Sequence, residues 1–365
     1  MLSFESLRGW VSIRALLPLL VMGCGAPDAE QDASEVGSVQ EELCCSSADD
    51  AQAIDLGVLE PGQFLYSVGL GINNRGTVVG MSQVPSTPAL NPFRAFRWTA
   101  RTGMVALDTL GGLSSRAADV NDREQVVGTI QLADGTSRAA LWDADGTAHD
   151  LGTLGGSHSS AEAINNRGQV VGVAINDSGK ARGFIWSERE GMVDLGFPVG
   201  DFGDPRDIND AGVVVGRIEK DIEVLPFKWT KKQGMTVLDN LDGREAVAES
   251  INNRGDIAGY TNQAGWVFGV KWTGRTSSPV LLETLAGALQ PWPIGINERG
   301  AIVGWIWPED SDMAAVEWTS PSRVRLLPLE GAAQAYDIND RGQVVGQWNS
   351  HAFILETGKR RCKPH

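Results

Sequence analysis

Residues 163–172 read AINNRGQVVG, and the same pattern returns six more times along the chain. Each copy has an Asn, then Asn, Asp or Glu, a Gly in most copies, and a β-branched run that ends in Gly. The leading residues stand 48, 44, 44, 43, 45 and 42 positions apart, at Asn73, Asn121, Asn165, Asn209, Asn252, Asn297 and Asn339. Asn bonds its own backbone and Gly accepts a positive φ, so the pair favours a tight hairpin turn. The pattern therefore predicts one β-hairpin in each of seven units.

Two further motifs repeat with the same period. A Trp follows each turn by about 17 residues, at Trp98, Trp142, Trp186, Trp229, Trp272 and Trp318, with Leu355 in the seventh place. A Leu-x-x-Leu-x-Gly motif or a close variant starts at Leu56, Leu107, Leu151, Leu195, Leu238, Leu282 and Leu326. Because they recur at one register, we interpret the Trp residues as core between units and the Asn residues as caps of their own turns.

Each unit of about 44 residues holds four short strands separated by polar or Gly-containing turns. This length and strand number match the blade of a β-propeller. One blade cannot bury both of its faces, so blades must stack, and seven copies without polar caps favour a closed ring over a long solenoid. We predict an all-β fold at residues 51–358, a seven-bladed propeller of four-stranded antiparallel blades.

The two ends of the array predict how the ring closes. Residues 53–59 have the pattern of a fourth strand with nothing before it, and residues 351–355 that of a third strand with nothing after it. The N-terminal strand is therefore expected to complete the last blade. This places Cys44 and Cys45 near Cys362, and in an oxidising compartment one of them can form a disulfide with Cys362. A bond from Cys44 or Cys45 to another protein is the alternative.

Residues 1–23 have the pattern of an export signal, with Arg8 and Arg14 before a short apolar run. The run is too short for a membrane-spanning helix, which needs about 20 apolar residues. Residues 21–24, Val-Met-Gly-Cys, resemble the lipobox of bacterial lipoproteins, which implies that Cys24 is lipidated and becomes the N-terminus. Because Gly25 follows Cys24, we expect an anchor at the outer membrane or the cell surface. An ordinary cleaved signal and a secreted protein are the alternative.

Charge limits the possible partners. The chain has 31 Lys and Arg against 46 Asp and Glu, a net charge of −15, and it shows no basic stripe. Nucleic-acid binding is therefore disfavoured. Residues 24–50 contain no Lys or Arg and little apolar material, which predicts an acidic disordered tether. Residues 359–365 form a basic tail. Membrane contact is expected only through the lipid anchor.

The repeat resembles a known family. Residues 151–156, Leu-Gly-Thr-Leu-Gly-Gly, together with residues 163–172, resemble the consensus of bacterial HAF-repeat proteins. The tripeptide His-Ala-Phe stands at residues 351–353, and degraded copies stand at residues 94–96, 138–140 and 182–184. The resemblance covers about residues 53–356. It implies an extracellular propeller, and it brings no common activity.

Five Trp residues lie outside both the signal and the repeat, all in the last three units: Trp266, Trp292, Trp305, Trp307 and Trp348. In a blade of four antiparallel strands, the loops that carry them emerge on one face, so we expect them to gather on one sector. Aromatic clusters mark recognition sites for sugars or proteins. We predict a non-catalytic binding or scaffold protein with a glycan or protein partner. The alternatives are a structural protein whose Trp residues are core and a propeller hydrolase or lyase.

Signals for catalysis or metal binding are sparse. The His residues have no partner in a G-x-S-x-G or H-E-x-x-H motif, so no catalytic residue is predicted. A carboxylate pair assembled in the channel from distant blades stays open. The candidates for a Ca²⁺ site are the carboxylates two residues before a turn Asn, at Asp119, Asp207 and Asp337. The run from Asp207 lacks the Glu that an EF-hand loop needs, where Ile218 stands. No cofactor is expected.

Overall fold

The computed structural model describes residues 51–356, except 63–64, 86–91, 199–201, 244, 275–277 and 310–311. These residues belong to one compact unit of the chain. The predicted signal, tether and tail, with Cys24, Cys44, Cys45 and Cys362, lie outside the described residues. No helix in the described part is long and apolar enough to cross a membrane.

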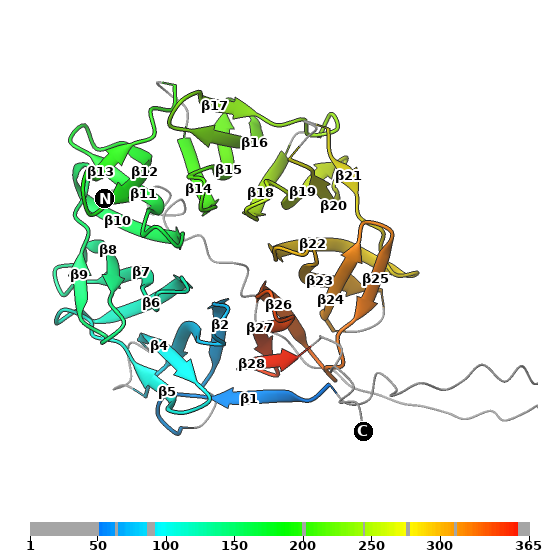
Figure 1. Cartoon of the computed structure of the whole chain (residues 1–365), viewed down its shortest axis with the longest axis horizontal. Helices are drawn as coiled ribbons and strands as arrows, with labels where there is room; N and C mark the ends of the chain where they lie inside the picture. The colour runs from blue at the N-terminus through cyan, green and yellow to red at the C-terminus, as the bar shows by residue number, and fades with distance from the viewer. Residues whose placement is uncertain are drawn as a thin grey trace, which may run out of the picture. The chain divides into compact units, whose positions relative to one another are not determined.

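The described chain is all β, as predicted, with 28 strands and no helix. Seven innermost strands surround a common centre (Figure 1): β2 (Ser67–Ile72), β6 (Ser114–Val120), β10 (Gly155–Ile164), β14 (Phe202–Ile208), β18 (Glu245–Ile251), β22 (Ala288–Ile296) and β26 (Ala333–Ile338). Each is followed in the chain by a second strand: β3 (Val78–Gln83), β7 (Val126–Gln131), β11 (Val170–Asn176), β15 (Val214–Lys220), β19 (Ile257–Gln263), β23 (Ile302–Pro308) and β27 (Gln343–Trp348).

The third strands are β4 (Phe93–Thr99), β8 (Ser137–Trp142), β12 (Ala181–Ser187), β16 (Glu223–Thr230), β20 (Trp266–Trp272), β24 (Ala314–Ser320) and β28 (His351–Glu356). The fourth strands are β5 (Gly103–Ala106), β9 (Ala148–Asp150), β13 (Gly191–Asp194), β17 (Gly234–Val237), β21 (Val280–Leu281) and β25 (Arg323–Leu326). β1 (Ala53–Gly57) pairs antiparallel with β28, so the first strand of the described chain joins the sheet of its last three. Sheets β14–β17 and β18–β21 are linked by one parallel pair, Val224 and Glu245.

The hydrophobic cores lie between neighbouring sheets, and the repeat Trp residues belong to them, as the sequence predicts. Trp142, Trp272 and Trp318 are fully buried. Their indole Nε1 groups donate to main-chain oxygens near the fourth strand of the preceding sheet, at 2.7 to 2.8 Å, on Asp108, Asp239 and Glu283 respectively. Each Trp therefore bonds to the preceding sheet, and Trp142 also packs against that sheet.

The turn Asn residues do more than cap their own turns. Oδ1 of each accepts the backbone N–H groups two and four residues later, at 2.9 to 3.1 Å, as expected for a cap. Nδ2 of each donates to the main-chain oxygen of the next turn Asn at 2.9 to 3.1 Å. These bonds run from Asn73 to Asn121, Asn165, Asn209, Asn252, Asn297 and Asn339, and from Asn339 back to Asn73. We call this closed circuit the Asn circle.

A second circuit runs beside the Asn circle. The backbone N–H after each turn Asn donates to the side chain of the residue after the next turn Asn, at 2.7 to 2.9 Å. The members are Asn74, Asp122, Asn166, Asp210, Asn253, Glu298 and Asp340, with Asp340 donating to Asn74. The acidic or amide residue in the second position of the motif is thus explained, because each must accept a hydrogen bond from its neighbour.

Candidate functional site

The seven innermost strands carry different residue types at two equivalent positions. The residues three positions before each turn Asn are Leu70, Ala118, Glu162, Arg206, Glu249, Ile294 and Tyr336, and those five positions before are Val68, Arg116, Ser160, Asp204, Val247, Trp292 and Gln334. Val68, Ile294 and Tyr336 belong to one apolar cluster although they come from three different sheets. Side chains at these positions on neighbouring innermost strands therefore pack against one another.

One side of this centre is charged. Arg116 of β6 pairs with Glu162 of β10 at 3.3 Å. Asp204 of β14 accepts Arg206 at 3.1 Å and Arg217 of β15 at 3.0 Å. We call these five residues, together with Glu249 of β18, the charged arc. Burial lowers the pKa of Arg206, but Asp204, Glu249 and Glu162 act against it and raise the pKa above its usual value. The guanidinium therefore lies among three carboxylates, Asp204 on its own strand and Glu162 and Glu249 on β10 and β18.

The other side is aromatic. The Tyr260 ring of β19 meets Trp292 of β22 edge-on, with ring centroids 4.6 Å apart. Trp292 stacks on Trp305 of β23 at 6.3 Å, and Trp305 meets Tyr336 of β26 at 5.4 Å. We call these four residues the aromatic arc. It crosses three consecutive sheets, and Trp292 is its one half-buried ring, whereas the other three are buried.

Several polar groups of the two arcs have no hydrogen-bond partner among the described residues. They are the Tyr260 hydroxyl, the indole N–H groups of Trp292 and Trp305, and the Glu249 carboxylate; the buried Nε of Arg206 is also without a partner. Tyr260 and Trp305 are 8% and 7% exposed. Of these groups only the Arg206 Nε is a fully buried atom, and in native proteins such atoms nearly always have partners. The other groups are not fully buried, so a ligand can reach them. The contrast is with Trp142, whose buried indole N–H is bonded within the protein.

The electrostatics of the Tyr260 hydroxyl depend on the charged arc. Burial raises its pKa, and Glu249 and Glu245 raise it further, so the phenol stays protonated at neutral pH. It is then a hydrogen-bond donor beside a carboxylate acceptor. We call the charged and aromatic arcs together the axial cluster.

The five Trp residues expected to form a surface patch have different environments. Trp266 and Trp307 are 53% and 46% exposed. Trp348 is half-buried and donates to the Glu330 oxygen at 2.7 Å. Trp292 is half-buried, whereas Trp305 is buried in the aromatic arc, unlike an exposed patch residue. A binding role for the five stays a prediction, and the structure connects two of them to the axial cluster.

The three carboxylates considered as Ca²⁺ ligands accept hydrogen bonds from backbone N–H groups. Asp119, Asp207 and Asp337 each accept the N–H of the following residue, and their second oxygens accept the N–H groups of Ile164, Ile251 and Ile72 in the next sheet at 2.7 to 2.9 Å. Burial, with the charges of Asp337 and Asp207, raises the pKa of Asp119 to about 7. Within the described ranges, no three His, Cys, Asp or Glu residues are placed to hold a metal ion.

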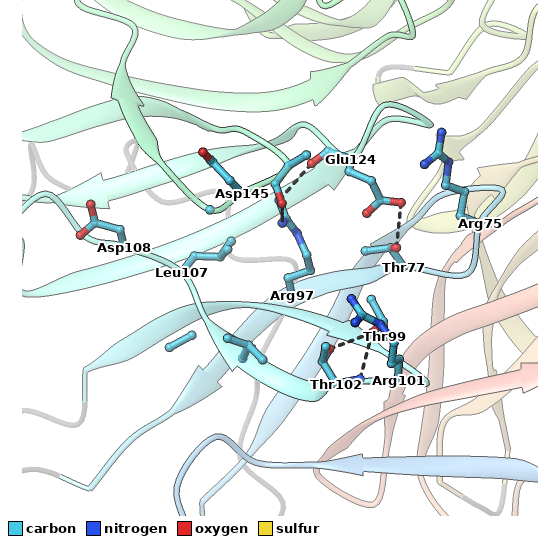
Figure 2. A pocket seen from close by; sticks show the side chains of 14 residues that line it. Arg75, Thr77, Arg97, Thr99, Arg101, Thr102, Leu107, Asp108, Glu124 and Asp145 are labelled. Carbon is cyan, nitrogen blue, oxygen red and sulfur yellow. Dashed lines mark hydrogen bonds between the residues drawn. The ribbon is translucent and has the colours of Figure 1, made fainter.

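A cavity of about 820 Å³ lies between the first two sheets, on the side of the Asn turns (Figure 2). Arg97 crosses it and donates to the main-chain oxygens of Ala144, Asp143 and Glu124 at 2.6, 2.8 and 2.9 Å. Burial lowers the pKa of Arg97, and the nearby Glu124 and Asp145 oppose that effect. The guanidinium thus ties the two sheets together, and we interpret the cavity as part of their contact.

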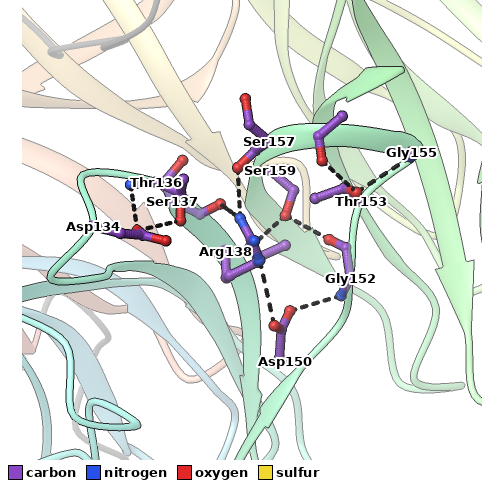
Figure 3. A network of polar contacts seen from close by, with 12 residues as sticks. Asp134, Thr136, Ser137, Arg138, Asp150, Gly152, Thr153, Gly155, Ser157 and Ser159 are labelled. Carbon is purple, nitrogen blue, oxygen red and sulfur yellow. Dashed lines mark hydrogen bonds and ion pairs between the residues drawn. The ribbon is translucent and has the colours of Figure 1, made fainter. Parts of the chain in front are cut away.

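The degraded HAF motifs also join sheets. The central N–H groups, of Ala95, Ala139 and Ala352, donate to Ser115, Ser159 and Ser67 of the next innermost strand at 2.8 to 2.9 Å. Figure 3 shows one such joint, where Ser159 also donates to the Gly152 oxygen at 2.6 Å and Arg138 donates to Ser157 and pairs with Asp150. The motif is therefore a structural element, and the axial cluster is the better candidate site.

No family model and no curated protein matches this chain. Solved structures do. The β-propeller domain of the trilobed protease from Pyrococcus furiosus has a TM-score of 0.58 at 10% identity, over 81% of this chain and 97% of that one. A puromycin-hydrolyzing peptidase from Mycobacterium tuberculosis gives 0.55 at 13%, over 78% of this chain but only 49% of the peptidase. Oligogalacturonate lyase from Vibrio parahaemolyticus gives 0.52 at 10%, over 86% and 95%. At these identities the likeness shows the fold alone, a β-propeller.

Proposed function

We propose that this chain is a non-catalytic recognition protein of the cell envelope, a closed seven-bladed propeller that binds a glycan or protein ligand at its axial cluster. The observation that carries the proposal is the set of unpartnered polar groups on Tyr260, Trp292, Trp305 and Glu249. Binding sites combine aromatic walls with a few polar groups that await a ligand. The neighbouring core Trp residues, whose N–H groups are bonded, have no such capacity.

The closed form of the ring has its own support. β1 pairs with β28, and the Asn circle returns from Asn339 to Asn73. The propeller domain of the Pyrococcus furiosus protease has an open velcro topology. Here the pairing of the first strand with the last sheet favours seven equivalent contacts between blades.

The proposed localisation of the protein rests on its sequence. The signal at residues 1–23 supports export, and the lipobox resemblance supports a lipid on Cys24. Anchoring at the outer membrane or the cell surface follows from these two features, with secretion as the alternative. A disulfide from Cys44 or Cys45 to Cys362 belongs to the same proposal, and mass analysis of the exported protein under non-reducing conditions tests it.

Surface plasmon resonance with full-length protein in detergent tests the binding function. Envelope saccharide and envelope protein fractions are passed separately over the parent, a Trp292→Ala variant and a Val193→Ala control, whose side chain is exposed on β13. We expect one fraction to bind the parent and the control, and to bind Trp292→Ala at least tenfold more weakly. Equal binding by all three would refute the axial site, and no binding to either fraction would refute the function. Cleavage of a bound glycan would favour the hydrolase or lyase alternative.

A further inference from the structure

The axial cluster carries information about the chemistry of its ligand. This step rests on the proposed binding function. The unpartnered groups include three donors, the Tyr260 hydroxyl and the indole N–H groups of Trp292 and Trp305, and one pure acceptor, the Glu249 carboxylate. A ligand that satisfies both must present acceptors and donors over a short distance.

Hydroxyl groups meet this requirement. Each hydroxyl offers one donor and two acceptor lone pairs, and it rotates to suit its partners. A ligand with several hydroxyls can therefore accept from Tyr260 and Trp305 and donate to Glu249. The half-buried ring of Trp292 adds an apolar surface, against which the C–H face of a pyranose can lie. A purely apolar ligand would cover these groups and leave them without hydrogen-bond partners.

The charges at the centre select against an acidic ligand. Arg116 is already paired with Glu162, and Asp204 takes both Arg206 and Arg217. Glu249 has no cation within ion-pair distance among the described residues. Three more carboxylates, Asp119, Asp207 and Asp337, lie near enough to one another on the innermost strands to raise the pKa of Asp119. The three Arg and three carboxylates of the charged arc balance in number, so the charge that a ligand carboxylate bonded to Tyr260 would meet is that of Glu249, which no ion pair neutralises.

We propose that the axial cluster is a carbohydrate site for an uncharged sugar, stacked on Trp292 and bonded through its hydroxyls to Glu249, Tyr260 and the indole N–H groups. A uronate oligomer is disfavoured because its carboxylates would lie beside Glu249. A polypeptide is disfavoured because its amides each offer a donor and an acceptor at fixed positions, whereas this site concentrates donors on one arc and a carboxylate on the other.

Isothermal titration of the full-length protein with four tetrasaccharides tests the inference: cellotetraose, xylotetraose, chitotetraose and tetragalacturonate. We expect at least one of the three uncharged sugars to bind and tetragalacturonate not to bind. Tyr260→Phe removes only an unpartnered hydroxyl and should weaken binding about fivefold, as loss of one hydrogen bond does. Its melting temperature should stay near that of the parent. Trp292→Ala should weaken binding at least tenfold.

Tyr66→Phe is the matched control. Its ring meets Phe93 edge-on with centroids 5.1 Å apart, outside the axial cluster, so the change should leave sugar affinity within about twofold. Equal effects of the two Tyr→Phe changes on affinity would overturn the site, and preferred binding of tetragalacturonate would overturn the charge argument. If no sugar binds while an envelope protein fraction still binds through Trp292, the carbohydrate inference fails and the proposed function survives. If neither binds, both fail.

Discussion

Replacement of Asn165 by Asp isolates the energy of the Asn circle. Nδ2 of Asn165 donates to the Asn209 oxygen at 3.0 Å and to Oε1 of Gln169 at 2.9 Å. Asp keeps the oxygen that accepts two backbone N–H groups but turns a second oxygen toward those two acceptors. Two lost hydrogen bonds cost about 1 kcal/mol each, and a buried carbonyl without a donor costs about 1–3 kcal/mol more. We therefore expect the free energy of unfolding to fall by about 3–5 kcal/mol at neutral pH.

Urea unfolding followed by Trp fluorescence measures this loss. The matched variant is Asn339→Asp, because Nδ2 of Asn339 donates to the Asn73 oxygen at 2.9 Å and to Oε1 of Gln343 at 2.8 Å. In a closed ring, the two variants should lose the same free energy to within about 0.5 kcal/mol. A much smaller loss for Asn339→Asp would refute closure between the first and last sheets. A loss below about 1 kcal/mol in both would refute the hydrogen-bond argument itself.

Three further predictions concern stability. Because the pKa of Asp119 is raised from 3.8 to about 7, the folded state holds this proton more tightly than the unfolded state. Its contribution to stability is therefore present below about pH 4 and lost as the pH rises toward 7. The free energy of unfolding of the parent should fall more steeply from pH 4 to 8 than that of Asp119→Asn. Parallel curves for the two proteins would contradict this prediction. Gly168 has a φ of +78°, so Gly168→Val should lower the free energy of unfolding by more than about 1 kcal/mol. Gly168→Asn should lower it clearly less, because Asn tolerates a positive φ. Equal melting temperatures for the two variants would argue against this turn conformation. Trp305→Ala should lower the free energy of unfolding by about 3–5 kcal/mol and Trp307→Ala by less than about 1 kcal/mol, because only Trp305 is buried. Equal shifts of the denaturant midpoint would contradict this difference in burial.

The repeated parts of the fold could be predicted from the sequence because the turn and core residues recur in seven units at the same spacing. The turn at Asn165 and the core position of Trp142 follow from residue type and register alone. The link from each turn Asn to the next could not be read in this way, because a cap and a bridge use the same side chain. Only the placement of neighbouring sheets shows that Nδ2 reaches another main-chain oxygen.

The candidate site was harder to predict because it lies where the units differ. The sequence drew attention to Trp292 and Trp305 as residues outside the repeat, but it did not show that one is half-buried and the other buried. Glu249 and Arg206 were missed. The available signal was their shared position three residues before a turn Asn, where other units carry Leu70, Ala118 or Ile294. Aligning the seven units by the turn and comparing that column would have found them.

The joints between sheets and the residues that face the centre occupy separate positions on the same strands. The turn Asn and the Ser that accepts from the third strand join neighbouring sheets through backbone groups, whereas the residues three and five positions before each Asn differ from sheet to sheet. Charged residues occupy these positions on β6, β10, β14 and β18, and aromatic residues occupy them on β22 and β26. Exchange of a single unit would therefore replace the residues at these two positions and could change ligand specificity, while the hydrogen bonds between turns stay the same.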